Sequence, residues 1–104
     1  MSSQETIKKT IDDNDVVLYM KGTADFPQCG FSGKAVQILN ACGTEFTSVD
    51  VLSDPDVREG VKQFSNWPTI PQLYIKGELV GGSDIMMEMY QSGELKEMLE
   101  AKAS

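Results

Sequence analysis

The residues best suited to chemistry in this sequence are its two cysteines, Cys29 and Cys42. The chain has no histidine, which removes imidazole metal ligands, Cys–His nucleophile pairs and the usual proton carrier at neutral pH. Any redox, nucleophilic or soft-metal chemistry must therefore depend on a thiol. Two cysteines without a secretory signal pattern indicate thiol chemistry rather than a disulfide scaffold.

Cys29 is expected at the start of a helix, after a loop that contains Pro27. A sulfur in that place lies near unpaired backbone N–H groups and the positive end of the helix dipole. Both favour the thiolate, which is the form that attacks disulfides and binds metals. Gly30 is expected to let the backbone approach closely at the turn. Ser32 stands where a Cys-x-x-Cys motif would carry its second thiol. The alternative is that Cys29 is only a small residue ending a loop.

Cys42 is a poor candidate for resolving a disulfide made by Cys29. On one helix, their separation of 13 positions corresponds to about 19 Å, whereas a disulfide needs Cα atoms within about 7 Å. Cys42 also falls on the apolar stripe of its helix, which predicts a buried structural cysteine. Release of a mixed disulfide at Cys29 therefore needs an external thiol. A single thiolate gives a metal only one ligand, and two chains give two.

The apolar pattern and its breakers predict the elements that position Cys29. The expected helices cover residues 4–12, 31–42, 55–66, 83–92 and 94–100, and the expected strands cover residues 16–20, 45–51, 72–75 and 79–80. The first two strands, joined through a helix, form a parallel unit, and the last two form an antiparallel hairpin. The sequence therefore predicts an α/β fold with a four-stranded mixed sheet flanked by helices. No linker or repeat divides the chain, so we expect one domain over residues 1–104.

The charge balance excludes several classes of function. Lys plus Arg total 9 and Asp plus Glu total 16, giving a net charge of −7. A surface of that sign repels phosphate backbones, so we expect no nucleic-acid partner. No apolar stretch is long enough to span a bilayer, and the first residues lack a signal-peptide pattern. We expect a cytoplasmic protein, or one of an organellar matrix if a transit peptide has been removed.

Four segments, in this order, resemble the monothiol glutaredoxins of the Cys-Gly-Phe-Ser class. They cover residues 20–22, 27–32, 67–73 and 77–84, and the resemblance spans nearly the whole chain. It implies a thioredoxin-like fold, glutathione binding and a 2Fe–2S cluster shared by two subunits. In that family each subunit gives one cysteine thiolate and each bound glutathione gives its own, which suits a cluster that favours thiolate ligands. The resemblance places Cys29 in this ligand role.

The same resemblance implies five glutathione-binding residues: Lys21, Arg58, Ile70, Ser83 and Asp84. The two cations would contact the glycine carboxylate, and Lys21 also the thiolates. Ile70 precedes a proline and is biased towards an extended backbone that can pair with a peptide. Ser83 and Asp84 begin a helix, whose N–H groups would bind the γ-glutamyl carboxylate while Asp84 receives the ammonium group.

Simpler roles remain open for these positions. Lys21 can be a solvated strand end, and Arg58 an ordinary exposed helix residue. Ser83 and Asp84 can be no more than a helix cap, although capping and ligand binding are compatible. Pro71, which the resemblance implies is cis, can be a strand-edge proline.

The leading functional hypothesis is a carrier of 2Fe–2S clusters that delivers them to apo iron–sulfur acceptor proteins. It would act as a homodimer or as a heterodimer with a BolA-like protein. Many family members have a cysteine at the position of Ser83, so thiol chemistry there is lost. In the family, the long loop at residues 22–28 accompanies poor glutathione–disulfide exchange, so oxidoreductase activity is expected to be weak.

Two other hypotheses remain open. One is a glutathione-dependent oxidoreductase, in which Cys29 removes glutathione from protein mixed disulfides and free glutathione completes the exchange. The other is a redox-inert interaction module.

Overall fold

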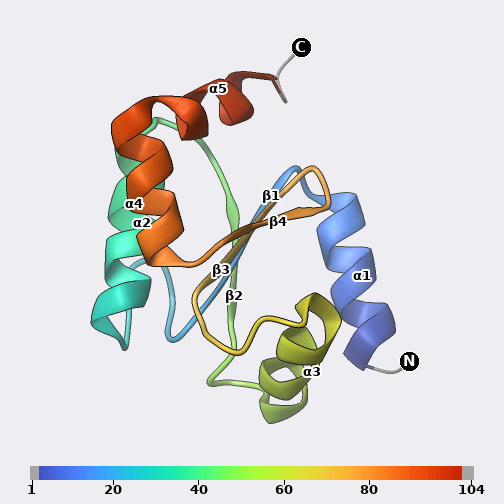
Figure 1. Ribbon diagram of the computed structural model, residues 1–104. Helices are drawn as coiled ribbons and strands as arrows, with labels where there is room; N and C mark the ends of the chain where they lie inside the picture. Colours follow the sequence, from blue (N-terminus) through green and yellow to red (C-terminus); the bar gives the residue numbers. More distant parts are fainter. Residues whose placement is uncertain (1–2, 102–104) are drawn as a thin grey trace.

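Among residues 3–101, which the structure describes, four strands form one mixed sheet with helices on both faces (Figure 1). The structure is a computed structural model. Its helices are α1 (Ser3–Asp13), α2 (Gly30–Ala41), α3 (Pro55–Ser65), α4 (Ser83–Ser92) and α5 (Glu94–Ala101). Its strands are β1 (Val16–Met20), β2 (Thr47–Asp50), β3 (Gln72–Ile75) and β4 (Glu78–Gly81).

The sheet has the strand order β2-β1-β3-β4. β1 pairs in parallel with β2 and antiparallel with β3, and β3 and β4 form an antiparallel hairpin. The hairpin turn holds Lys76 at φ 52° and Gly77 at φ 81°, and two successive positive φ angles match the right-handed twist of the flanking strands. The predicted four-stranded mixed sheet, with a helix between its parallel strands, is confirmed.

The side chains of β1 build both halves of the core because successive residues of a strand point to opposite faces. Val16, Leu18 and Met20 pack with residues of α2, α4 and α5. Val17 and Tyr19 pack on the other face with residues of α1 and α3. Figure 1 shows the same division, with α2, α4 and α5 on one side of the sheet and α1 and α3 on the other. The continuous apolar run of β1 is buried along its whole length.

Helix α3 begins at a well-formed cap. The Asp54 carboxylate accepts hydrogen bonds from the backbone N–H groups of Asp56 at 3.0 Å and Val57 at 3.4 Å, and Pro55 occupies the first turn. A carboxylate cap and an early proline both favour a helix start at this point. The helix ends at Asn66, which adopts the left-handed conformation with φ 54°. The Asp54 cap fixes where the first turn of α3 starts, and Arg58 lies on that turn.

Element boundaries differ from the predictions by a few residues. The strand expected over residues 45–51 is limited to Thr47–Asp50, because pairing with β1 begins at Val17 and Thr47. The helix expected from Phe31 begins one residue earlier, at Gly30. The single-domain prediction covers residues 1–104, of which 1–2 and 102–104 lie outside the described residues.

Candidate functional site

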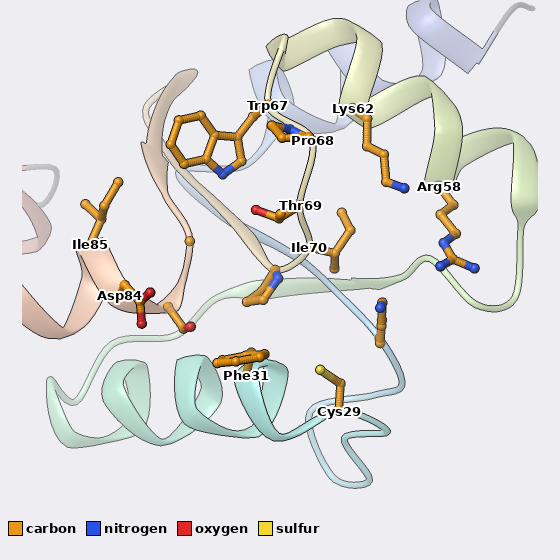
Figure 2. A pocket seen from close by; sticks show the side chains of 14 residues that line it. Cys29, Phe31, Arg58, Lys62, Trp67, Pro68, Thr69, Ile70, Asp84 and Ile85 are labelled. Carbon is orange, nitrogen blue, oxygen red and sulfur yellow. The ribbon is translucent and has the colours of Figure 1, made fainter.

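A pocket of about 420 Å³ opens between the start of α2, helix α3, the segment before β3 and the start of α4 (Figure 2). Its lining includes every residue that the sequence singled out for the site: Lys21, Cys29, Arg58, Ile70, Ser83 and Asp84. These residues come from five separate places in the chain: the end of β1, the start of α2, helix α3, the segment before β3 and the start of α4. The structure therefore brings the predicted site residues together, and their roles towards glutathione stay predictions.

Cys29 is the N-cap residue of α2, with an extended backbone at φ −150° and ψ 139°. Its side chain is partly exposed, and Figure 2 shows the sulfur pointing into the pocket. The pKa of this thiol is lowered chiefly by a hydrogen bond from the backbone N–H of Ser32, against a smaller opposing effect of burial. The backbone N–H of Phe31, the charge of Lys21 and the Ser32 hydroxyl lower the pKa further. The thiolate is favoured, as expected at a helix start.

Ser32 is fully buried, at 0% exposure. Its Oγ accepts a hydrogen bond from the backbone N–H of Lys21 at 3.0 Å. Ser32, which stands where a second thiol would be, therefore links the first turn of α2 to the end of β1. It also provides a hydroxyl near the Cys29 sulfur.

The second cysteine lies at the far end of the same helix. Cys42 is the C-cap residue of the 12-residue helix α2, so about 18 Å of helix lies between the two thiols. Cys42 was expected to be buried, but it is only partly buried at the edge of the core. Burial raises its pKa, against the opposing charge of Lys96. The prediction that Cys42 cannot resolve a disulfide at Cys29 agrees with this placement.

Positive charge gathers on one side of the pocket. Lys21 follows β1, and Arg58 and Lys62 project from α3, as Figure 2 shows for the two α3 side chains. Arg58 is half-buried and its Nε is buried without a hydrogen-bond partner among the described residues, which argues against an ordinary exposed position. Sequence reasoning missed Lys62, although it lies four residues after Arg58, on the same helix face.

The opposite wall combines the segment before β3 with the start of α4. The Ile70–Pro71 peptide bond is cis, as the resemblance implied. Ile70 and Ser83 are almost fully buried, whereas Asp84 is exposed. Gly82 lets α4 approach closely, because a Cβ at this position would lie 3.3 Å from the Pro71 carbonyl oxygen.

A buried amide shapes the loop that carries this wall. The Gln72 side-chain N–H₂ donates to the carbonyl oxygens of Trp67 at 2.9 Å and Thr69 at 3.1 Å. Its Oε1 accepts a hydrogen bond from the Tyr74 hydroxyl at 3.0 Å. Trp67 in turn lines the pocket. Gln72 looked like an ordinary strand residue, and no sequence signal marked this role.

One expectation around the thiol is wrong, and one large apolar side chain there is exposed. Phe31 is 60% exposed and lines the pocket, because it sits in the first turn beside Cys29. Gly30 was expected to permit a close approach, but a Cβ there would meet no atom within 4 Å. The glycine without room is Gly22, with φ +90°, where a Cβ would lie 2.6 Å from the backbone N of Gln28.

The described residues contain no group of three or more cysteine, aspartate, glutamate or histidine side chains placed to hold a metal ion. No helix within residues 3–101 is long and apolar enough to cross a membrane.

Comparisons with known proteins give a consistent result. The glutaredoxin family model matches residues 16–80. An uncharacterized monothiol glutaredoxin (ycf64-like) of Synechocystis is 58% identical over 94 residues, which is 90% of this chain and 88% of the relative. The solution structure of reduced poplar apo GrxS14 superposes with a TM-score of 0.84 at 52% identity, covering 97% of this chain and 94% of that one.

A more distant likeness shows the fold alone. The crystal structure of a buckwheat glutaredoxin–glutathione complex has a TM-score of 0.84 at 20% identity, covering 95% of this chain and 88% of that one. That homologue holds glutathione. The family match over most of the chain and the high identity to a monothiol relative both agree with the single pocket thiol, Cys29. The chain therefore belongs to the glutaredoxin family, as a monothiol glutaredoxin with the thioredoxin-like fold.

Proposed function

We propose that this monothiol glutaredoxin binds glutathione in the pocket and that two chains together carry a 2Fe–2S cluster to apo acceptor proteins. The observation that carries the proposal is a single, partly exposed thiol of lowered pKa beside three cations in one pocket. The Cys29 thiolate can attack a disulfide or bind a metal. The positive charges of Lys21, Arg58 and Lys62 suit an anionic ligand.

Glutathione is a tripeptide with a carboxylate at each end and one ammonium group, and the pocket has matching groups at both ends. Lys21 and Arg58 would bind the glycine carboxylate. The N–H groups at the start of α4, with Ser83 and Asp84, would bind the γ-glutamyl carboxylate and its ammonium group. The extended backbone at Ile70 would pair with the peptide between them.

The cluster is the cargo in this proposal, and its ligands follow from a count of sulfur atoms. Iron–sulfur clusters are held by thiolates, and the described residues of one chain lack a further set of metal-binding side chains near Cys29. Cys29 and one glutathione would supply two thiolates, and a second copy would supply two more. A heterodimer with a BolA-like protein is the alternative assembly.

Anaerobic reconstitution tests the carrier function. Iron and sulfide are added to the reduced chain with and without glutathione, followed by absorption spectroscopy and sizing. We expect a coloured dimer only with glutathione, the same result for Cys42→Ser, and a colourless monomer for Cys29→Ser. A colourless wild-type protein in the presence of glutathione would overturn the proposal.

A glutathione-dependent oxidoreductase is the second candidate, favoured by the lowered thiol pKa and by the buried Ser32 hydroxyl where a resolving thiol would stand. Cys29 would take glutathione from a protein mixed disulfide, and a free glutathione thiolate would then release it. Turnover of a glutathionylated protein, abolished in Cys29→Ser and indifferent to iron, would favour this function. A negligible rate beside ready cluster assembly would reject it as the main role.

A further inference from the structure

Asp50 is placed where the parallel strands β1 and β2 separate to form opposite sides of the pocket. It is the last residue of β2 and pairs with Met20, the last residue of β1. Beyond this pair, β1 continues into Lys21 and the loop that leads to Cys29. β2 continues through Leu52 towards α3, which carries Arg58.

One oxygen of the Asp50 side chain binds both departing segments. Its Oδ1 accepts a hydrogen bond from the backbone N–H of Gly22 at 2.9 Å and another from the backbone N–H of Leu52 at 2.9 Å. The Asp50 carbonyl oxygen also accepts from the Ser53 hydroxyl at 2.8 Å. Hydrogen bonds to an ionised acceptor are the strong ones in proteins. The residue therefore links the backbone after β1 to the backbone before α3.

The segment that Asp50 holds is tightly packed. The Lys21 backbone donates to Ser32 Oγ at 3.0 Å and accepts from the Gln28 N–H at 2.9 Å. Gly22 has no room for a Cβ. A small change in the direction of this backbone is thus passed on to the side chain of Lys21 and to the loop that ends at Cys29.

We propose that Asp50 is a positioning residue of the glutathione pocket, whose carboxylate oxygen sets the spacing between Lys21 and the cation-bearing helix α3. This inference rests on the proposed binding of glutathione. Asp50 does not line the pocket, so its effect acts through the backbone of Gly22 and Leu52. Charge-assisted contacts depend on placement to well under an ångström.

Two substitutions separate hydrogen-bond geometry from charge. Asp50→Asn keeps a side-chain oxygen at the same place but loses the charge, and Asp50→Glu keeps the charge but moves the oxygen by one methylene group. Asp12→Glu is the matched control, because the Asp12 carboxylate also accepts a charge-assisted hydrogen bond, from Lys8 Nζ at 2.7 Å, but lies on α1 and does not line the pocket. Glutathione affinity of each reduced chain is measured by calorimetry and by the fluorescence of Trp67, the chain's single tryptophan. Thermal unfolding of each variant is recorded alongside.

We expect Asp50→Glu to bind glutathione on the order of tenfold more weakly, as for one badly placed charge-assisted contact. Asp50→Asn is expected to stay within about threefold of wild type, and Asp12→Glu to bind as wild type. Wild-type affinity in Asp50→Glu, equal losses in Asp50→Glu and Asp50→Asn, or an equal loss in Asp12→Glu would each overturn the inference alone. Failure of the wild-type chain to bind glutathione would overturn the proposed function and the inference with it.

Discussion

The lowered pKa of Cys29 arises from the first turn of α2 and from Lys21 at the end of β1. The backbone N–H of Ser32 is the largest influence that lowers the pKa of the thiol, and the Ser32 hydroxyl and the charge of Lys21 add to it. Because Ser32 is buried and also bonded to the Lys21 backbone, its hydroxyl is held in a fixed position. The thiolate is thus stabilised by the first turn of α2 rather than by a histidine, which the sequence lacks.

Replacing Ser32 with alanine should raise the pKa of Cys29. The substitution removes the hydroxyl but keeps the backbone N–H, so the pKa should rise only part of the way to its ordinary value. The rate of alkylation by iodoacetamide, measured against pH, should fall near pH 7 and converge with wild type above about pH 9. Ser48→Ala, at an exposed position, is the control. Coincident profiles for Ser32→Ala and wild type would contradict this account.

Arg58→Ala should weaken glutathione binding by about tenfold, because a charge-assisted contact is lost from the pocket. Lys34→Ala is the matched control, since Lys34 also lies on a helix but is exposed and does not line the pocket. Calorimetric titration of the reduced chains compares the two. Equal affinities in both variants would remove Arg58 from the binding site.

The site residues differ in how well sequence could predict them. Cys29 and Asp84 stand in recognisable motifs, and the structure places both at the pocket. Gln72 acts through hydrogen bonds to carbonyl groups of the irregular segment just before it, and Asp50 through a hydrogen bond to Gly22, 28 residues away. Such partners depend on the three-dimensional arrangement, so no local pattern reveals them.

At the scale of elements, the loop between β1 and α2 places the thiol. It is closed by a bridge between Gly22 and Pro27 and by reciprocal backbone hydrogen bonds between Thr23 and Phe26, at 3.1 and 3.3 Å. Phe26 is 74% exposed at its tip. The loop is therefore compact in its backbone while it presents an aromatic ring to solvent.

Gly22 and Gly30 flank this loop. Replacing each with alanine should change the free energy of unfolding differently at the two positions. Gly22→Ala is expected to cost at least about 2 kcal/mol of unfolding free energy, because a positive φ combines with a Cβ clash against backbone atoms. Gly30→Ala should be neutral or stabilise by up to about 1 kcal/mol, since its Cβ would meet open space. Urea unfolding measures both. A comparable loss in the two variants would mean that the loop is not held as described.

For the whole molecule, binary patterning was enough to predict the order of strands and helices and the mixed sheet. The apolar run of β1 identified the centre of the core because both of its faces are covered. The pocket could not be derived in the same way. Its walls come from segments as distant as Lys21 and Asp84, and the exposed position of Phe31 depends on how α2 meets those segments.

A pair of aromatic rings in the half of the core beside α1 and α3 makes stability sensitive to high pH. Tyr19 and Tyr74 contact edge to face with centroids 5.8 Å apart. Burial, followed by the neighbouring Tyr74, raises the pKa of Tyr19 from 10.0 to about 12. The folded state then holds the proton more tightly than the unfolded state, so stability is fully present below about pH 10 and is lost as pH rises towards 12.

Tyr19→Phe should therefore flatten the fall in stability above pH 10. A difference of two pKa units corresponds to about 2–3 kcal/mol once both states have titrated. Urea unfolding at intervals from pH 8 to 11 compares wild type, Tyr19→Phe and Tyr90→Phe, the last at an exposed position. An unchanged slope in Tyr19→Phe would show that this ring does not cause the alkaline loss.

The serine at position 32 has a kinetic consequence. Once exchange with a disulfide has left a mixed disulfide on Cys29 and released the other thiol, no neighbouring thiol of the chain can discharge it, so the lifetime of the adduct would vary inversely with the concentration of small thiols around the molecule. The fraction of Cys29 held as this adduct would then be low where small thiols are plentiful and high where they are depleted.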